Sequence, residues 1–125
     1  MEQPSNIDAD KLAQRIHDAR LMEARDIDSL LSKAGGRGQA DIELFTNFLL
    51  RGEHITNWQL RRLIEGHRKG YFYGDWKIIY RIGEGTFARV YRASNIKTGD
   101  IKAIKVLRSR PVSYTHLTLP TILLV

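Results

Sequence analysis

Two glycines and the backbone that follows them are the residues of this sequence best suited to bind phosphate. Residues 82–90 read IGEGTFARV, so Gly83 and Gly85 are separated by a single residue. Glycine tolerates positive φ and has no Cβ, which lets the backbone approach a ligand closely. The N–H groups of residues 86–88 can then point at phosphate oxygens. The segment therefore predicts a loop that cradles phosphate groups.

Two other known kinds of nucleotide-binding glycine loop are less consistent with the residues that come after Gly85 in this sequence. The loop of a dinucleotide-binding fold leads directly into a helix, whereas residues 89–94 (RVYRAS) have the alternation and side-chain types of a strand. The P-loop motif ends in Gly-Lys followed by Ser or Thr, and the sequence contains no such run. The pattern G-x-G-x-x-A is weak evidence by itself, but its setting favours a loop between two strands.

Lys105 supplies the cation that a polyphosphate ligand needs. The alternation of residues 101–107 predicts a strand on which Ala103 and Lys105 share one face. A lysine on the strand beside a glycine loop can pair with phosphate oxygens. The separation between Gly83 and Lys105, with a turn between them, makes this pair the strongest functional signal in the sequence.

The glycine loop, its flanking apolar residues Ile82 and Val90, and the run Ala103-Ile104-Lys105 together resemble the protein-kinase signature. The resemblance covers roughly residues 76–108. The preceding helices and the FYGDW segment are more loosely similar to N-terminal extensions of bacterial, eukaryotic-like serine/threonine kinases. The resemblance of residues 76–108 to the protein-kinase signature implies a kinase N-lobe, ATP as the ligand, and a parent enzyme that transfers the γ-phosphate to protein hydroxyls.

The resemblance also assigns roles within the expected ATP site. It implies that Ile82 and Val90 enclose the adenine, with Ala103 above it. It implies that amides at residues 86–87 cover the phosphates and that Lys105 pairs with the α- and β-phosphates. The complete set of expected nucleotide-binding residues is Ile82, Gly83, Glu84, Gly85, Thr86, Phe87, Ala88, Arg89, Val90, Ala103 and Lys105.

The sequence departs from the kinase pattern in several places. Ala88 replaces the third glycine, and Lys102 replaces an apolar residue on the face opposite Lys105, where we expect it to be exposed to solvent. The His-Arg-Asp catalytic loop, the magnesium-binding Asp-Phe-Gly and the helix with the glutamate partner of the lysine are missing. We therefore predict no catalytic residues and no metal ligands here, an inactive truncated chain, and Mg²⁺ only for the parent enzyme.

Three antiparallel strands must position this site. Residues 76–82 alternate and should form the first strand, followed by residues 89–93 and residues 101–107. Residues 95–100 (NIKTGD) should form the turn between the last two. The expected fold class is α+β, with a helical module over residues 1–70 and a truncated kinase N-lobe over residues 71–110. The side chains expected on one face of the first strand are Trp76, Ile78, Tyr80 and Ile82.

Four short amphipathic helices are expected before the strands, because apolar residues recur there at spacings of three and four. The clearest start is a capping box formed by Thr56 and Gln59. Other expected N-caps are Asp8 or Asp10, Asp26 and Asp41, and expected stops are glycines 35–36, 52 and 66. Helices this short need mutual packing. The module is interpreted either as a docking module or as a bundle that packs on the next domain.

Composition places the chain among globular proteins, with 42% hydrophobic and 27% charged residues. The absence of cysteine excludes disulfides and thiolate metal sites and fits a reducing compartment. The N-terminus lacks a secretory signal, and no apolar run approaches about 20 residues. We therefore expect a cytoplasmic location and no membrane segment in this chain, although the parent protein could carry an anchor elsewhere.

The positive charge is concentrated in the second half of the chain. Residues 1–70 hold eleven acidic and eleven basic side chains, whereas residues 71–110 hold three acidic and nine basic ones. Such a segment could attract nucleic acid, but a strand region that holds polyphosphate accounts for the same charge. We therefore expect ATP and the protein substrates of the parent kinase as partners, and no nucleic acid.

The last 15 residues differ from the rest of the chain. Residues 111–125 contain no Asp, Glu, Lys or Arg, and residues 112–121 (VSYTHLTLPT) resemble the translation of a transposase sequencing adapter. We therefore predict that this segment derives from adapter DNA. The leading hypothesis is the ATP-binding part of a serine/threonine protein kinase. The alternative is a pseudokinase or scaffold in which the helical module binds partners.

Overall fold

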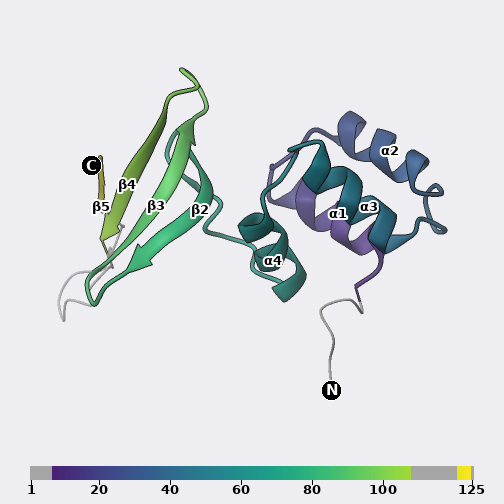
Figure 1. Ribbon diagram of the computed structural model, residues 1–125, viewed down its shortest axis with the longest axis horizontal. Helices are drawn as coiled ribbons and strands as arrows, with labels where there is room; N and C mark the ends of the chain where they lie inside the picture. Colours follow the sequence, from purple (N-terminus) through teal and green to yellow (C-terminus); the bar gives the residue numbers. More distant parts are fainter. Residues whose placement is uncertain (1–6, 108–120, 125) are drawn as a thin grey trace. The chain divides into compact units, whose positions relative to one another are not determined.

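The chain forms two compact units, Met1–Gly70 and Tyr71–Val125, each described below by itself (Figure 1). The structure is a computed structural model that describes residues 7–107 and 121–124. The first unit contains four α helices and the second an antiparallel sheet. The α+β composition expected from the sequence is therefore present. Among the described residues, no helix has both the length and the apolar character needed to cross a membrane.

The helices of the first unit are α1 (Ala9–Asp18), α2 (Ala24–Lys33), α3 (Ile42–Arg51) and α4 (Asn57–Glu65). Three of the expected N-caps are confirmed. The Asp8 carboxylate accepts a hydrogen bond from the Lys11 N–H at 2.7 Å, and Asp41 accepts one from the Glu43 N–H at 2.9 Å. At α4, Thr56 and Gln59 exchange both hydrogen bonds of the capping box.

The expected N-cap of α2 is wrong. Glu23 is the N-cap and makes no side-chain capping hydrogen bond, while Asp26 lies in the first turn of the helix. The backbone N–H groups of Asp26 and Ile27 both donate to the Glu23 carbonyl. An acidic residue is favourable anywhere in the first turn, because it interacts with the positive end of the helix dipole. The aspartate therefore marked the start of the helix but not its first residue.

Apolar residues from all four helices form the core of the first unit, and α1 packs against both α2 and α4. The Arg15 guanidinium on α1 donates to the carbonyls of Leu63 and Ile64 at 2.7 and 3.1 Å. Both carbonyls lie in the last turn of α4, where the regular helical hydrogen bonds end, and that of Leu63 also accepts from the Gly66 N–H. The largest side chains that are almost completely buried here are Leu12, Ile16, Leu31, Phe45, Leu49 and Leu63.

The sheet of the second unit has the order β1-β2-β3-β4-β5, and all neighbouring strands are antiparallel. Its strands are β1 (Phe72–Tyr73), β2 (Trp76–Glu84), β3 (Ala88–Asn95), β4 (Ile101–Leu107) and β5 (Thr121–Leu124). The three strands expected from the sequence are confirmed as β2, β3 and β4. The turn between β3 and β4 is also confirmed. Asn95 Oδ1 accepts from the Lys97 and Thr98 N–H groups, and Gly99 has a φ of +80°.

Strand β5 lies within the segment expected to derive from adapter DNA. It pairs with β4, with Lys105 opposite Leu123 and Val106 opposite Ile122. Residues 111–120 of that segment, and residue 125, lie outside the described residues. The pairing extends the sheet beyond the three expected strands, and it does not bear on the source of the encoding DNA.

The expected arrangement of side chains along β2 is wrong, because the strand contains two irregularities in its pairing with β3. Ile78 lies opposite Ala93, but Tyr80 lies opposite Arg92, the adjacent residue of β3. Consecutive residues of a strand point to opposite faces, so Ile78 and Tyr80 do not share a face. An extra residue in one strand, a β-bulge, shifts the alternation in this way. A second shift occurs between Arg81 and Gly83 and leaves Ile82 without a pairing partner in β3.

The register between the strands defines two faces of the sheet. On one face, Val90 lies opposite Lys105; we call this the Lys105 face. On the other, Tyr91 lies opposite Ile104; we call this the Tyr91 face. The Tyr91 face holds the core of the unit, and its buried members are Ile78, Tyr91, Ala93, Ile104 and Val106.

Candidate functional site

Three of the expected site residues form a row across the Lys105 face. Gly83 in β2 is the partner of Val90 in β3, and Val90 is the partner of Lys105 in β4. Directly opposed residues of antiparallel strands have Cβ atoms about 5 Å apart. All three residues are half-buried, so they are held by the sheet but remain accessible. The fold therefore places the first glycine of the loop and the lysine on the same face of the sheet, with β3 between them.

Ala103 lies on the same face, as expected from its spacing to Lys105. Its partner in β3 is Arg92, which in turn lies opposite Tyr80 in β2. Arg92 and Tyr80 were not among the expected site residues. The alternation of β3 could have identified Arg92, because it is two residues from Val90. Tyr80 could not have been identified, because the bulge in β2 places it on this face.

The loop between β2 and β3 is closed by a hydrogen bond from the Gly85 N–H to the Ala88 carbonyl at 2.7 Å. Neither Gly83 nor Gly85 lies in the left-handed region, so the loop does not use the positive φ that glycine permits. Within the described residues, a Cβ at Gly83 would meet no atom within 4 Å, and one at Gly85 would lie 3.7 Å from the Ala88 carbonyl oxygen. The glycines therefore leave open space beside the backbone instead of permitting a special conformation.

The residues around the loop tip differ in exposure. Thr86 is exposed, Phe87 is 61% exposed and Ile82, at the second bulge, is 53% exposed. Ala88 is buried and lies opposite Leu107 in β4. The alanine in place of a third glycine is thus a strand residue that contributes to packing, and the exposed tip comprises residues 85–87.

The side chains of Glu84 and Arg89 lie on the Tyr91 face, away from Lys105. These two residues are partners in the register, and Arg89 Nε lies 3.4 Å from a Glu84 carboxylate oxygen. The other Glu84 oxygen accepts from Arg81 at 2.9 Å. The neighbouring Tyr91 raises the pKa of Arg89, and the negative charge of Glu84 raises it further. Of the expected nucleotide-binding residues, these two can therefore face a ligand on the Lys105 face only through their backbone.

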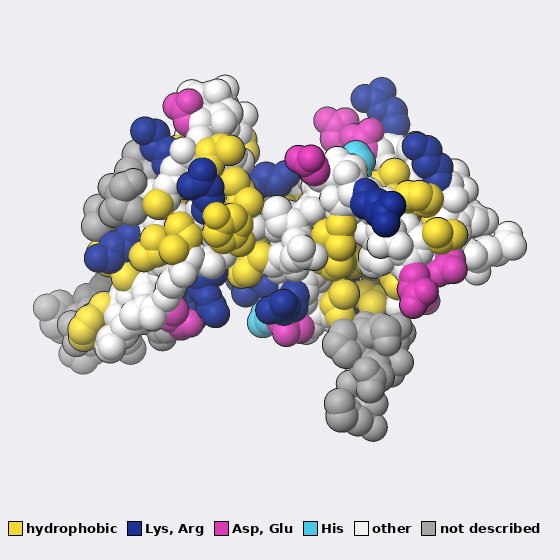
Figure 2. Space-filling view, in the orientation of Figure 1, with side chains coloured by type: hydrophobic (Ala, Val, Ile, Leu, Met, Phe, Trp, Pro, Cys, Tyr) yellow, Lys and Arg dark blue, Asp and Glu magenta, His cyan; other side chains and the backbone are white. Residues whose placement is uncertain are grey.

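By register, the three long strands place three basic side chains on each face of the sheet, but their one acidic side chain lies on the Tyr91 face only. Lys77, Arg92 and Lys105 all lie on the Lys105 face by register. The acidic residue of β2, β3 and β4 is Glu84, which lies on the opposite face. Burial lowers the pKa of Lys77. Figure 2 shows lysine and arginine side chains among hydrophobic ones over this unit. The Lys105 face thus combines apolar surface with positive charge, as an aromatic base carrying phosphates requires.

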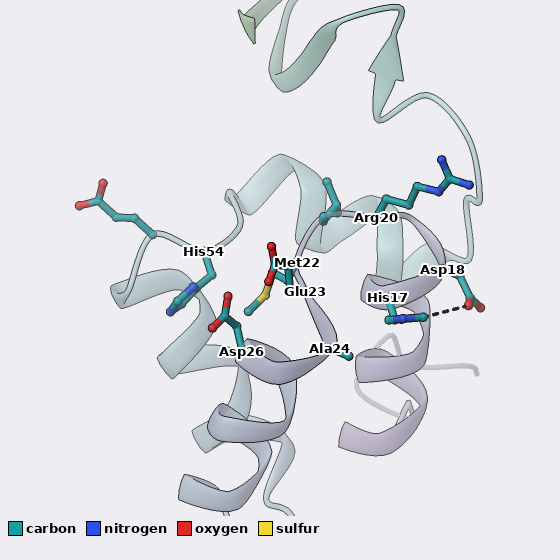
Figure 3. Close-up of a pocket in the computed structure, with 10 residues that line it drawn as sticks. His17, Asp18, Arg20, Met22, Glu23, Ala24, Asp26 and His54 are labelled. Carbon is teal, nitrogen blue, oxygen red and sulfur yellow. Dashed lines mark ion pairs between the residues drawn. The ribbon is translucent and has the colours of Figure 1, made fainter. Parts of the chain in front are cut away.

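The helical unit contains a separate open depression, shown in Figure 3, with a volume of about 900 Å³. Four carboxylate residues and one arginine contribute to its wall, so its charge disfavours a phosphate ligand. Its two histidines come from α1 and from the loop after α3, and His17 Nδ1 lies 3.9 Å from Asp18. None of the expected site residues belongs to it. The lining residues are His17, Asp18, Arg20, Leu21, Met22, Glu23, Ala24, Asp26, Glu53 and His54.

Comparison with known proteins gives a short kinase match. The chain is 49% identical over 37 residues to mitogen-activated protein kinase kinase kinase kinase 3 from rat, human and mouse. The match covers 30% of this chain and 4% of each of those proteins. No protein-family profile matches the chain, and no solved structure matches it. Part of the chain is therefore similar in sequence to a protein kinase, and the relatives named are mammalian.

Proposed function

We propose that the β2–β3 hairpin and β4 form the ATP-binding part of a serine/threonine protein kinase. The observation that carries the proposal is the row of Gly83, Val90 and Lys105 across three strands of one face. The short sequence match to named kinases supports it. Transfer of the γ-phosphate to protein hydroxyls is proposed for the longer kinase of which such a hairpin is one part.

The residues of the Lys105 face suit the parts of ATP differently. Val90 and Ala103 offer half-buried apolar surface to the adenine. Lys105 offers an ammonium group to the phosphates, with which it would form charge-assisted hydrogen bonds. The open space at Gly83 and Gly85 lets the backbone of the loop approach the phosphate oxygens. Each part of the ligand thus has a counterpart on this face.

Magnesium has no counterpart on the described part of this face. Mg²⁺ prefers carboxylate and phosphate oxygens, but none of the residues of β2, β3 and β4 on the Lys105 face is acidic. These strands therefore do not fit a protein-bound Mg²⁺, and the proposal assigns them nucleotide binding alone.

A matched pair of lysines on β4 tests the proposal. Lys105 faces the expected site, whereas Lys102 is exposed on the Tyr91 face opposite Ala93. Hydrogen bonds to charged groups contribute about 1.5–3 kcal/mol. We therefore expect Lys105→Ala to weaken ATP binding by about 10- to 100-fold in isothermal titration calorimetry.

Lys102→Ala removes the same charge from the same strand and should leave the affinity within about twofold, since surface charges away from a ligand are screened by salt. Equal losses in both variants would show that ATP senses only the net charge of the unit. Absence of ATP binding by the unaltered chain, with circular dichroism showing that it is folded, would refute the proposal.

A further inference from the structure

One carboxylate links the two strands on either side of the glycine loop. Glu84, the last residue of β2, accepts a hydrogen bond from Arg81 at 2.9 Å through one oxygen. Its other oxygen accepts from Arg89 Nε, near the start of β3, at 3.4 Å. We call Arg81, Glu84 and Arg89 the ion triad. It fixes the two ends of the loop to each other on the face opposite Lys105.

The ion triad spans a gap in the backbone pairing of the hairpin. The register between β2 and β3 shifts between Arg81 and Gly83, so that Ile82 has no partner in β3. Arg81 lies before this shift and Glu84 after it. The pairing of β2 with β3 is therefore locally disrupted between Arg81 and Gly83 and resumes at Gly83 and Glu84. The side chains of the triad connect the two sides of the irregularity.

The triad also lies next to the core of the sheet. Arg89 lies two residues from Tyr91 on the same face of β3, and Tyr91 is only 3% exposed. The ring of Tyr91 stacks on that of Tyr73 in β1, with centroids 5.8 Å apart. The stacked rings and the ion triad thus lie on the Tyr91 face, next to each other along β3.

We propose that Glu84 is a positioning residue, which holds the glycine loop over the Lys105 face through Arg81 and Arg89 without touching the nucleotide. The role of the loop in ATP binding rests on the proposed function, whereas the restraint of the loop does not. Glu84 should therefore matter for ligands that carry phosphates, which the loop covers, and much less for adenosine.

Substitution of Glu84 by glutamine tests the proposal, because it removes the charge and keeps the shape of the side chain. In the nucleotide-free chain, hydrogen exchange at residues 85–88 should become several-fold faster, relative to residues 101–107. The dissociation constant for ATP should rise by about three- to tenfold, in keeping with the weakness of partly exposed ion pairs. The dissociation constant for adenosine should change by less than about twofold.

Asp75→Asn provides a matched control in the same unit. Among the described residues, Asp75 pairs with Lys97 at 3.5 Å, and neither residue belongs to the hairpin loop. Its substitution should change neither the exchange at residues 85–88 nor the ratio of ATP to adenosine affinity. A charge reversal, in which Glu84→Arg is combined with Arg81→Glu and Arg89→Glu, should restore slow exchange and the ATP affinity.

The two proposals fail in different ways. Unchanged exchange at residues 85–88 in Glu84→Gln, or an equal acceleration in Asp75→Asn, would overturn the positioning role whatever the ligand. Equal losses for ATP and adenosine would also overturn it, because they would indicate a general structural effect. Absence of ATP binding by the unaltered chain would refute the proposed function, while the exchange measurements would still decide whether Glu84 restrains the loop.

Discussion

The helical unit and the sheet unit treat their large hydrophobic side chains differently. Among the described residues, the helical unit leaves Leu44 exposed, while its other large apolar side chains are at least half-buried. The described residues of the sheet unit include five such side chains that are exposed: Tyr80, Ile82, Phe87, Ile96 and Ile101. Exposed apolar surface on a folded unit often marks a place where something binds. The helical unit therefore buries, at least in part, nearly all of its described large apolar side chains, whereas the sheet unit leaves apolar surface that a ligand or a partner could contact.

The glycines of the hairpin loop differ from Gly35 and Gly66 of the helical unit, and also from Gly99 of the sheet unit, all of which have positive φ. Gly66 ends α4 in the left-handed conformation, with a φ of +90°, and Gly35 has a φ of +132°. Gly83 and Gly85 in the hairpin lie outside that region and have free space where a Cβ would project. The helical unit therefore needs glycine for the shape of its backbone, whereas the hairpin has it where a ligand could approach.

The largest expected effect contrasts a buried and an exposed apolar residue. Phe45 in α3 is completely buried, and Phe45→Ala should destabilise the helical unit by about 3–5 kcal/mol. Ile82 is more than half exposed, so Ile82→Ala should cost less than about 1 kcal/mol, in proportion to the area that it buries. Urea unfolding followed by circular dichroism and tryptophan fluorescence measures both. Similar losses of stability in Phe45→Ala and Ile82→Ala would contradict the difference in burial between these two apolar side chains.

A second pair of substitutions compares a glycine that has positive φ with a glycine that does not. Gly66→Ala should destabilise the chain by about 1 kcal/mol, because alanine is strained in the left-handed region. Gly83→Ala should leave the stability almost unchanged but weaken ATP binding, since its Cβ would fill the space expected to receive the ligand. Thermal unfolding and calorimetric titration distinguish the two results. A large loss of stability in Gly83→Ala would contradict the account of the loop.

The smallest expected effect concerns Lys77, whose pKa in the folded chain is lowered from 10.5 by burial. The unfolded chain then binds more protons than the folded chain between the lowered pKa and 10.5, so this lysine makes stability rise with pH over that window. Lys77→Met removes the contribution. The stability of the unaltered chain should therefore improve relative to this variant as the pH rises toward 10.5. Urea unfolding of both proteins at several pH values measures this difference.

Local signals in the sequence predicted much of both units. The capping box at Thr56, the Asp41 cap and the turn at Gly99 depend on residues close together in the chain, and all three are confirmed. The common face of Ala103 and Lys105 follows from simple alternation and is confirmed by the register. Such features are specified within a few residues and need no knowledge of neighbouring elements.

The features that the sequence did not predict depend on neighbouring strands. The bulges of β2 shift Tyr80 to the Lys105 face, and they are defined by the count of residues against β3. The Glu84 carboxylate meets Arg81 and Arg89 only once that register is set. The start of α2 was misplaced for a different reason, because an aspartate is favourable at several positions of a first turn.

The central claim is that the sheet unit, and not the helical unit, binds ATP. The most direct measurement is the titration of ATP into the 125-residue chain, followed through backbone amide chemical shifts. We expect the largest shifts at residues 82–90 and 103–105, with the amides of residues 7–70 almost unmoved. Shifts concentrated around His17 and His54 in the helical depression, with residues 82–90 unaffected, would contradict the claim.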